Sequence, residues 1–182
     1  MDNTDIPLCV DLDGTLIKED VFRYTFKKIL LNNPIKLLWL PVWLMRGRGY
    51  TKIKISYILK IDFKQLTYNN KLILFLRNEK SKGRIIVLVT GTDYVSAEKI
   101  ANHVGVSSSV LGSDERMNLT GRNKYDKLIS LYGYKKFDYV GNSWIDRYVW
   151  SGSRNVYYVA PDKTIQDKIM TVFKPSKIFY WD

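Results

Sequence analysis

The fold of this chain is decided by residues 8–16, Leu-Cys-Val-Asp-Leu-Asp-Gly-Thr-Leu. A short apolar run that ends at a turn is typical of a buried strand in a parallel sheet. Asp11 and Asp13 then lie at the carboxyl end of that strand, where open α/β sheets bind ligands. Two carboxylates so close together raise each other's pKa unless a cation joins them, and a divalent metal would be such a cation. The alternative for this motif alone is an acidic turn without a function.

Composition and charge narrow the class of protein. The chain has 182 residues, 46% of them hydrophobic and 26% charged, as expected for one globular domain with room for an insertion. The formal net charge of +11 favours polyanionic partners, namely an anionic membrane, nucleic acid or phosphorylated ligands. Because no zinc spacing, recognition-helix pattern or stacking signature is present, nucleic-acid binding is not expected.

The compartment is inferred from what the sequence lacks. Cys9 is the single cysteine, so an internal disulfide is excluded, and its apolar neighbours indicate a buried structural thiol. The first residues have no basic start or apolar core of a secretory signal, and no apolar run reaches the length of a membrane span. We expect a cytoplasmic protein that is at most peripherally associated with a membrane.

The order of the elements predicts the fold class. Apolar runs predict strands near 7–12, 84–90, 107–111, 137–140 and 155–159, with helical patterns between them. Asp93 is placed to N-cap the helix that follows the second strand. Strands that alternate with helices predict an α/β fold with a three-layer αβα, Rossmann-like core and a parallel sheet. We expect a catalytic core of residues 1–18 and 83–182, and a helical cap of residues 19–82 inserted after the first strand.

Three later segments place polar residues at strand or helix ends. Thr90, Gly91 and Thr92 follow the second strand, and a hydroxyl with free amides there would form an anion site. Lys124 lies at the start of a helix, and residues 141–146, Gly-Asn-Ser-Trp-Ile-Asp, follow the fourth strand. Singly, each has a structural explanation, such as a helix-capping region or a solvated lysine. Their common placement after strands makes a shared site the better interpretation.

These motifs resemble those of the haloacid dehalogenase-like (HAD) superfamily of aspartate-nucleophile phosphohydrolases. Residues 11–15, Asp-Leu-Asp-Gly-Thr, match the first motif, Thr90 the second, Lys124 the third, and Gly141-Asn142 with Asp146 the fourth. The chain most resembles the HAD-like domain fused to UbiA-type aromatic prenyltransferases. It shares with that domain the apolar helical insertion and residues 139–143, Tyr-Val-Gly-Asn-Ser.

The resemblance implies a phosphatase with a covalent intermediate. Asp11 would attack phosphorus, and Asp13 would first protonate the leaving oxygen and then deprotonate the hydrolytic water. Mg²⁺ would be bound by Asp11, the main-chain carbonyl of Asp13, and Asp146. Lys124 would stabilise the charge on the phosphoryl group and on Asp11.

The remaining site residues would bind the phosphate. Thr90 and the amides of Gly91 and Thr92 are expected to hold the non-transferring oxygens, with Asn142 beside them. Many members carry Asp where this chain has Asn142, so we expect weaker metal binding. The expected substrate is a phosphorylated small molecule, a lipid-linked phosphate or a phosphoprotein. A membrane-docking or regulatory module with little turnover is the alternative function.

The predicted cap contains a second distinctive segment. Residues 29–45 are strongly apolar, Pro34 and Pro41 interrupt them, and a basic cluster that includes Arg46, Arg48 and Lys52 follows. We favour helices that pack on each other, because a small cap needs its own core. The alternatives are contact with an anionic membrane and a groove for an apolar substrate tail. Near the other end of the chain, residues 179–181, Phe-Tyr-Trp, are expected to be packing residues or to dock a partner.

Overall fold

The computed structural model describes residues 3–58, 62–160 and 163–181, and within them the side chains of all but residues 3, 48 and 163–166. One parallel sheet lies at its centre, in the order β3-β2-β1-β4-β5-β6. The strands are β1 (Leu8–Val10), β2 (Ile86–Asp93), β3 (Ser109–Ser113), β4 (Asp138–Gly141), β5 (Val156–Ala160) and β6 (Lys177–Tyr180).

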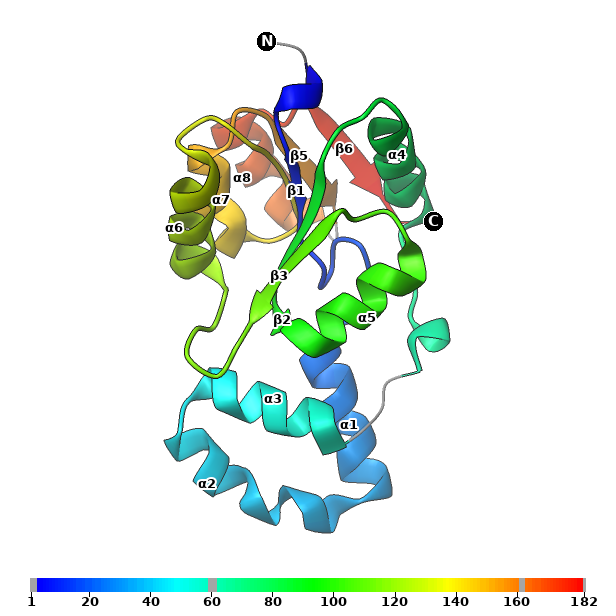
Figure 1. Cartoon of the computed structure of the whole chain (residues 1–182), viewed down its shortest axis with the longest axis vertical. Coiled ribbons are helices and arrows are strands. Elements are labelled where there is room, and N and C mark those ends of the chain that lie inside the picture. The colour runs from blue at the N-terminus through cyan, green and yellow to red at the C-terminus, as the bar shows by residue number, and fades with distance from the viewer. Residues whose placement is uncertain (1–2, 59–61, 161–162, 182) are drawn as a thin grey trace.

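Helices cover both faces of this sheet (Figure 1). One face carries α4 (Asn70–Ser81) and α5 (Tyr94–Val104), and the other carries α6 (Gly121–Tyr132), α7 (Arg147–Gly152) and α8 (Lys163–Phe173). Alternate residues of β1 supply the two cores, since Leu8 and Val10 pack with α4 and α5 whereas Cys9 packs on the other face. The predicted three-layer α/β fold is confirmed.

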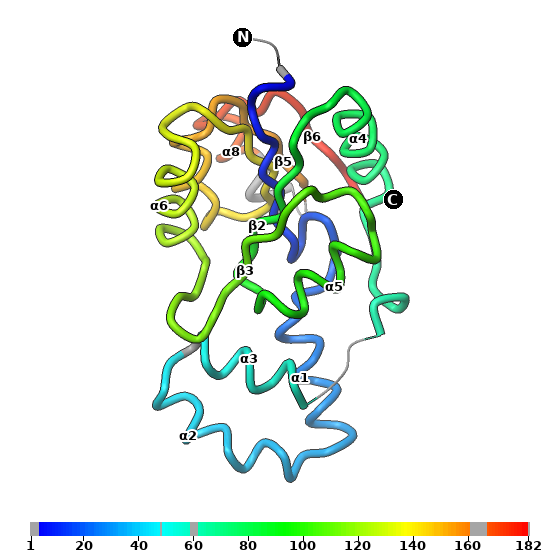
Figure 2. The backbone as a smooth tube through the Cα atoms, viewed as in Figure 1, coloured from blue at the N-terminus to red at the C-terminus, as the bar shows by residue number. Residues whose placement is uncertain are grey.

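The insertion after β1 forms a separate lobe of helices, α1 (Val21–Asn32), η2 (Pro34–Trp39), α2 (Leu40–Met45) and α3 (Arg48–Ile58). This lobe lies beyond the carboxyl ends of the strands, as the backbone trace shows (Figure 2). The lobe is joined to β2 through η3 (Phe63–Gln65) and α4. Although residues 19–82 were predicted as one cap, α4 packs on the sheet, where Leu72 and Leu76 join the core of β1.

Two predictions about elements need correction. The strand near 155–159 is not the last, because α8 and the edge strand β6 follow it, and Phe179 is buried in the sheet's core. The helices of the insertion do contact one another, as favoured for residues 29–45, but after Ile29 this segment does not supply the expected buried core. Ile29 is buried, but no residue from 30 to 47 is, and Trp39 is 63% exposed. The side chain of Arg48 lies outside the described part.

Candidate active site

Asp11 lies at the point where the strand order reverses, between β2 and β4. Its amide donates to the carbonyl of Val140 (3.0 Å), which fixes the end of β1 beside β4. The chain then turns at Gly14, whose φ is +72°. A Cβ atom there would lie 2.1 Å from Nδ2 of Asn142, so only glycine lets the two strand-end loops approach this closely. Such a switch point is where open α/β sheets bind ligands.

A buried ion pair joins Asp11 to Lys124 of α6. The ammonium of Lys124 donates to Oδ1 of Asp11 at 2.7 Å and lies 3.8 Å from Oδ1 of Asp146. Burial raises the pKa of Asp11 to about 7, and the charges of Asp146 and Asp13 add to this effect, which Lys124 only partly offsets. Burial alone would lower the pKa of Lys124, but the charges of Asp11 and Asp146 raise it overall, so the lysine stays cationic.

Asp13 is held by three donors from two segments. The hydroxyls of Thr92 (2.7 Å) and Thr90 (3.1 Å) donate to Oδ2, and the amide of Val21, the first residue of α1, donates to Oδ1 (2.8 Å). Burial raises the pKa of Asp13, and these hydrogen bonds oppose the rise. The carboxyl is therefore fixed in position between β2 and the lobe.

The contacts of Thr90 differ from the predicted ones. Its hydroxyl donates to Asp13 and accepts the amide of Thr92 (3.0 Å), and the side chain is fully buried. In this arrangement the Thr90 hydroxyl and the Thr92 amide, which were predicted to bind phosphate, both donate hydrogen bonds to protein atoms. Gly91 and Thr92 do line the cavity beside Asp11, so this strand end forms part of its wall.

Asp146 closes the loop after β4. Its Oδ2 accepts the amides of Asn142 (3.2 Å) and Ser143 (3.1 Å) and the hydroxyl of Ser143 (3.1 Å), as a capping box. A Cβ atom on Gly141 would lie 2.8 Å from the Asp146 carboxyl carbon. The loop thus holds one oxygen of Asp146 and brings Asn142 to the cavity wall.

Tyr139 is a site residue that the sequence did not reveal. Its hydroxyl accepts from Lys124 (2.9 Å) and donates to Oδ1 of Asp146 (2.9 Å), and its side chain is fully buried in β4. Burial raises the pKa of Tyr139 well above its ordinary value, with the charges of Asp146 and Asp11 adding to the effect, so the hydroxyl stays protonated. In the sequence this tyrosine has the pattern of an ordinary core residue of a strand.

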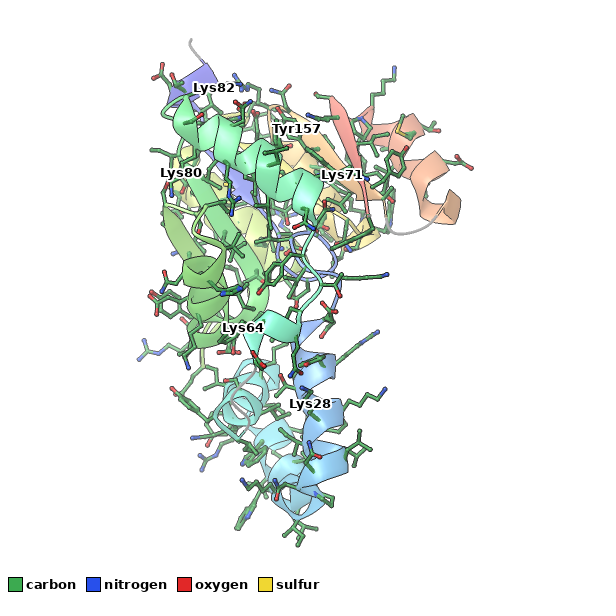
Figure 3. The ribbon with its side chains drawn as sticks, turned by 90° about the vertical axis from the view of Figure 1, so that its right-hand side faces the viewer. Lys28, Lys64, Lys71, Lys80, Lys82 and Tyr157 are labelled. Atoms are coloured by element: carbon green, nitrogen blue, oxygen red, sulfur yellow. The ribbon has the colours of Figure 1, made fainter. Side chains whose placement is uncertain are left out.

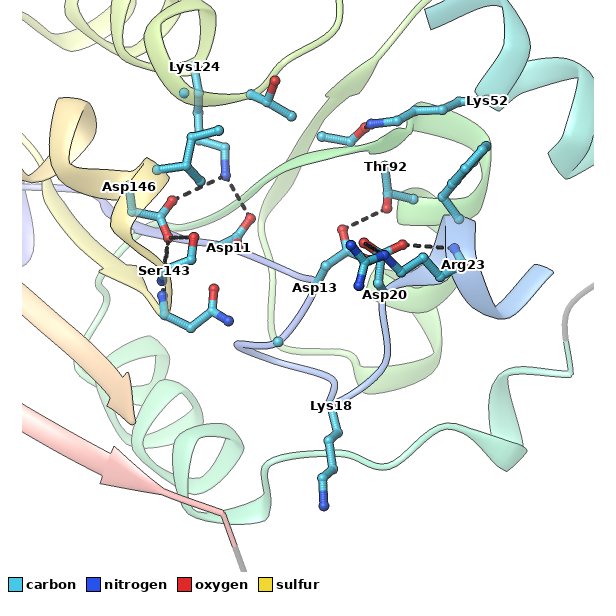
Figure 4. A pocket seen from close by; sticks show the side chains of 17 residues that line it. Asp11, Asp13, Lys18, Asp20, Arg23, Lys52, Thr92, Lys124, Ser143 and Asp146 are labelled. Atoms are coloured by element: carbon cyan, nitrogen blue, oxygen red, sulfur yellow. Dashed lines mark hydrogen bonds and ion pairs between the residues drawn. The ribbon is translucent and has the colours of Figure 1, made fainter. Parts of the chain in front are cut away.

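A cavity of about 440 Å³ lies between the core and the lobe (Figure 4), and its lining includes Asp11, Asp13, Lys124, Asn142 and Asp146. The lobe contributes Lys52 of α3, whose ammonium donates to the carbonyl of Gly91 (2.8 Å) and to Oδ1 of Asn118 (3.0 Å). Lys18 and Arg23 also line the cavity, together with Asp20. The sequence placed Lys52 only in a basic surface cluster, because nothing in it shows that α3 reaches β2.

The oxygen donors at the cavity fit a magnesium ion. In the described ranges, no three His, Cys, Asp or Glu side chains are grouped as metal ligands. The oxygen atoms that could hold the ion belong to the carboxylates of Asp11 and Asp146, the main-chain carbonyl of Asp13 and the side-chain amide of Asn142, and both carboxylates also accept hydrogen bonds within the protein. Because the pKa of Asp11 stays raised beside Lys124, a further cation would relieve the remaining repulsion. Mg²⁺ prefers such oxygen ligands.

Comparisons of sequence identify one relative but no family. No protein-family model matches the chain. It is 29% identical over 165 residues to the uncharacterized protein y4nM of Sinorhizobium fredii. That alignment covers 90% of this chain and 32% of the relative, so the chain spans about a third of the relative's length.

Solved structures share the fold. A protein of unknown function from Bordetella pertussis superposes with a TM-score of 0.72 at 14% identity, covering 97% of this chain and 99% of that one. A HAD-family hydrolase from Salmonella enterica serovar Typhi gives 0.63 at 10% identity, covering 94% and 73%. A phosphoserine phosphatase, solved as a phospho-aspartyl intermediate analogue, gives 0.60 at 13% identity, covering 97% and 94%. The chain has a HAD-like fold. At these identities the HAD-like fold is the shared property.

Proposed function

We propose that this protein is a Mg²⁺-dependent phosphohydrolase that acts on a phosphomonoester through an aspartyl-phosphate intermediate. The observation that carries the proposal is the Asp11 carboxylate, which lines the cavity at the strand-order reversal and pairs with Lys124 at 2.7 Å. The phosphoserine phosphatase of the same fold, solved with a phospho-aspartyl analogue, supports it. So does the resemblance to the HAD-like domain fused to UbiA-type prenyltransferases.

In the first step, an oxygen of Asp11 forms a bond to phosphorus while the bond from phosphorus to the leaving oxygen breaks. The leaving oxygen takes a proton from Asp13. Burial raises the pKa of Asp13, which favours the protonated form that this transfer needs, while its hydrogen bonds oppose the rise. Its three hydrogen bonds hold the carboxyl in a fixed position for the transfer.

In the second step, water attacks phosphorus and Asp13 takes the proton of that water. The bond between phosphorus and Asp11 breaks, which releases phosphate and restores the carboxylate. Acid–base assistance of this kind is worth about 10²–10⁴-fold in rate. Lys124, oriented by the hydroxyl of Tyr139, stabilises the negative charge on Asp11 and on the phosphoryl oxygens.

The cavity walls supply the groups for phosphate. We assign the non-transferring oxygens to Gly91, Thr92 and Asn142, which line the cavity. Thr90 and Thr92 would both first give up hydrogen bonds, because the hydroxyls of both donate to Asp13 and the amide of Thr92 donates to Thr90. Mg²⁺, held by Asp11, Asp146 and the carbonyl of Asp13, would neutralise charge between the carboxylates and the phosphate dianion. Lys52 and Arg23 from the lobe favour an anionic substrate, either a small molecule, a lipid-linked phosphate or a phosphoprotein.

A regulatory or docking module with little turnover is the second candidate, and Asn142 favours it because an amide supplies no charge to a metal. Hydrolysis of p-nitrophenyl phosphate separates the two functions. Wild-type protein should hydrolyse it with Mg²⁺ and lose activity with chelator, and the isosteric variant Asp11→Asn should be inactive. Asp126→Asn, on the exposed surface of α6, is the matched control and should stay active. Equal rates for wild type and Asp11→Asn would refute the proposed nucleophile.

A further inference from the structure

The lobe presents an exposed apolar face at its far end, which we call the tip (residues 30–47). Its strongly exposed apolar side chains are Leu30, Leu31, Ile35, Leu38, Trp39, Val42, Leu44 and Met45. Two of these, Leu38 and Met45, are 76% and 89% exposed. Exposed apolar side chains that gather in one short segment in this way are typical of an interaction site.

The charge of the lobe is one-sided. Residues 21–58 hold eight of the 29 Lys and Arg residues and none of the 18 Asp and Glu residues. This segment therefore carries +8 of the net charge of +11. On the tip itself, Lys36 and Arg46 are exposed among the apolar side chains. The partner of this face must be negatively charged and must also accept apolar side chains.

The tip faces away from the catalytic cavity. The lobe meets the core through the start of α1 and through Lys52 of α3, whereas η2 and α2 lie at the opposite end (Figure 1). A side view shows the same lobe projecting from the core, with Lys28 on its α1 helix (Figure 3). A surface that covers the tip would leave the cavity between lobe and core open.

We propose that the tip docks on the surface of an anionic phospholipid bilayer, with its apolar side chains in the interface and its basic side chains among the headgroups. Tryptophan and leucine beside lysine and arginine are the composition that binds such interfaces. A second copy of the chain does not fit, because two lobes of +8 repel each other. Among the described residues, no helix is long and apolar enough to span a bilayer. The inference does not depend on the proposed hydrolysis.

Co-sedimentation with vesicles tests the inference. The full chain is mixed with vesicles of phosphatidylcholine alone or of phosphatidylcholine with phosphatidylglycerol. We expect sedimentation with the anionic vesicles, little with the neutral ones, and a loss of binding at high salt. A basic residue near such a surface is worth about 1 kcal/mol. The pair Lys36→Gln and Arg46→Gln should therefore weaken binding about 25-fold, since every 1.4 kcal/mol is about tenfold.

Matched variants separate the tip from general surface effects. The triple variant Leu38→Ser, Trp39→Ser and Met45→Ser should stay in the supernatant, because its side chains are exposed and their loss spares the fold. Leu74→Ser, Ile85→Ser and Leu131→Ser remove three exposed apolar side chains from the core and should bind like wild type. Lys127→Gln with Lys136→Gln is the charge control on the core.

Two results would overturn the inference. One is that the tip variant and the core variant sediment with anionic vesicles to the same extent. The other is that the wild-type chain does not bind anionic vesicles but self-associates in analytical ultracentrifugation. In that case the tip variant would have lost the self-association. That second outcome would assign the tip to a second copy of the chain. Circular dichroism of each variant confirms that the fold is intact before binding is compared.

Discussion

Replacing Asp11 by Asn should stabilise the protein while it destroys the catalytic carboxylate. Burial, with smaller contributions from Asp146 and Asp13, raises the pKa of Asp11 from 3.8 to about 7 in the folded chain. An acid whose folded pKa is raised stabilises the fold at a pH below its unfolded pKa, and this contribution is lost as the pH rises through the folded pKa. Above pH 7 the folded protein therefore holds an unfavourable buried charge that Asn lacks.

The size of the effect follows from the shift in pKa. One unit of pKa corresponds to about 1.36 kcal/mol, so a rise from 3.8 to about 7 corresponds to about 4 kcal/mol. The difference in unfolding free energy between Asp11→Asn and wild type should grow by about this amount between pH 4 and pH 8. At pH 8 the variant should therefore have the larger unfolding free energy. Below pH 4 both side chains are neutral, so only the remaining differences between an amide and a carboxylic acid persist there.

The assay is urea unfolding of the chelator-treated protein, followed by circular dichroism at a series of pH values. Subtracting wild type from variant at each pH cancels the titration of groups that do not contact Asp11. Lys124 is the exception, because the charge of Asp11 contributes to its raised pKa. Asp126→Asn, which removes an exposed carboxylate from α6, is the matched control. A difference for Asp11→Asn that does not change with pH would refute the reasoning that burial dominates at Asp11. Added Mg²⁺ should stabilise wild type more than the variant, because only wild type has the anionic ligand.

Two further predictions concern groups around Asp11, and a third concerns Asp138 at the other end of β4. Asn142→Asp should lower the Mg²⁺ concentration needed for half-maximal hydrolysis, since it adds a carboxylate, and an unchanged requirement would exclude position 142 from the metal site. Tyr139→Phe removes the hydroxyl between Lys124 and Asp146 and should cost about 1.5–3 kcal/mol of stability in urea unfolding, so an unchanged midpoint would contradict its bridging role. Asp138→Asn removes one of the two carboxylate partners of the buried Arg84, and also a partner of the half-buried Arg154, and should cost about 3–5 kcal/mol, measured in the same way at pH 7. Although burial would raise the pKa of Asp138, hydrogen bonds from those arginines lower it, so this stability should fade in wild type as the pH falls below 4.

Much of the cavity wall was predictable because parallel strands end at one edge of a sheet. Each of these wall residues follows an apolar run in the sequence. They are Asp11 and Asp13 after β1, Gly91 near the end of β2, and Asn142 after β4. The topology then requires that these strand ends lie side by side. The functional roles assigned to these residues stay predictions.

Contacts that depend on packing could not be predicted in this way. Lys52 contacts Gly91 and Asn118, which are distant in the sequence, and Tyr139 lies inside β4, where its side chain has the pattern of an ordinary core residue. The edge strand β6 has four residues and is partly exposed, so its pattern is too short to separate from a loop. The tip was misjudged because hydrophobicity counts apolar side chains without showing whether any partner covers them.

The central claim is that Asp11 carries the phosphoryl group, and the variant Asp13→Asn tests it most directly. An aryl phosphate has a leaving group that departs without a proton, so phosphoryl transfer to Asp11 should proceed in this variant. Hydrolysis of the intermediate should stall, because no base remains for the water. After incubation with Mg²⁺ and acid quenching, peptide mass spectrometry should find a phosphoryl group on Asp11. Finding no phosphoryl group there while aryl phosphate is turned over, or finding it on another residue, would contradict the account.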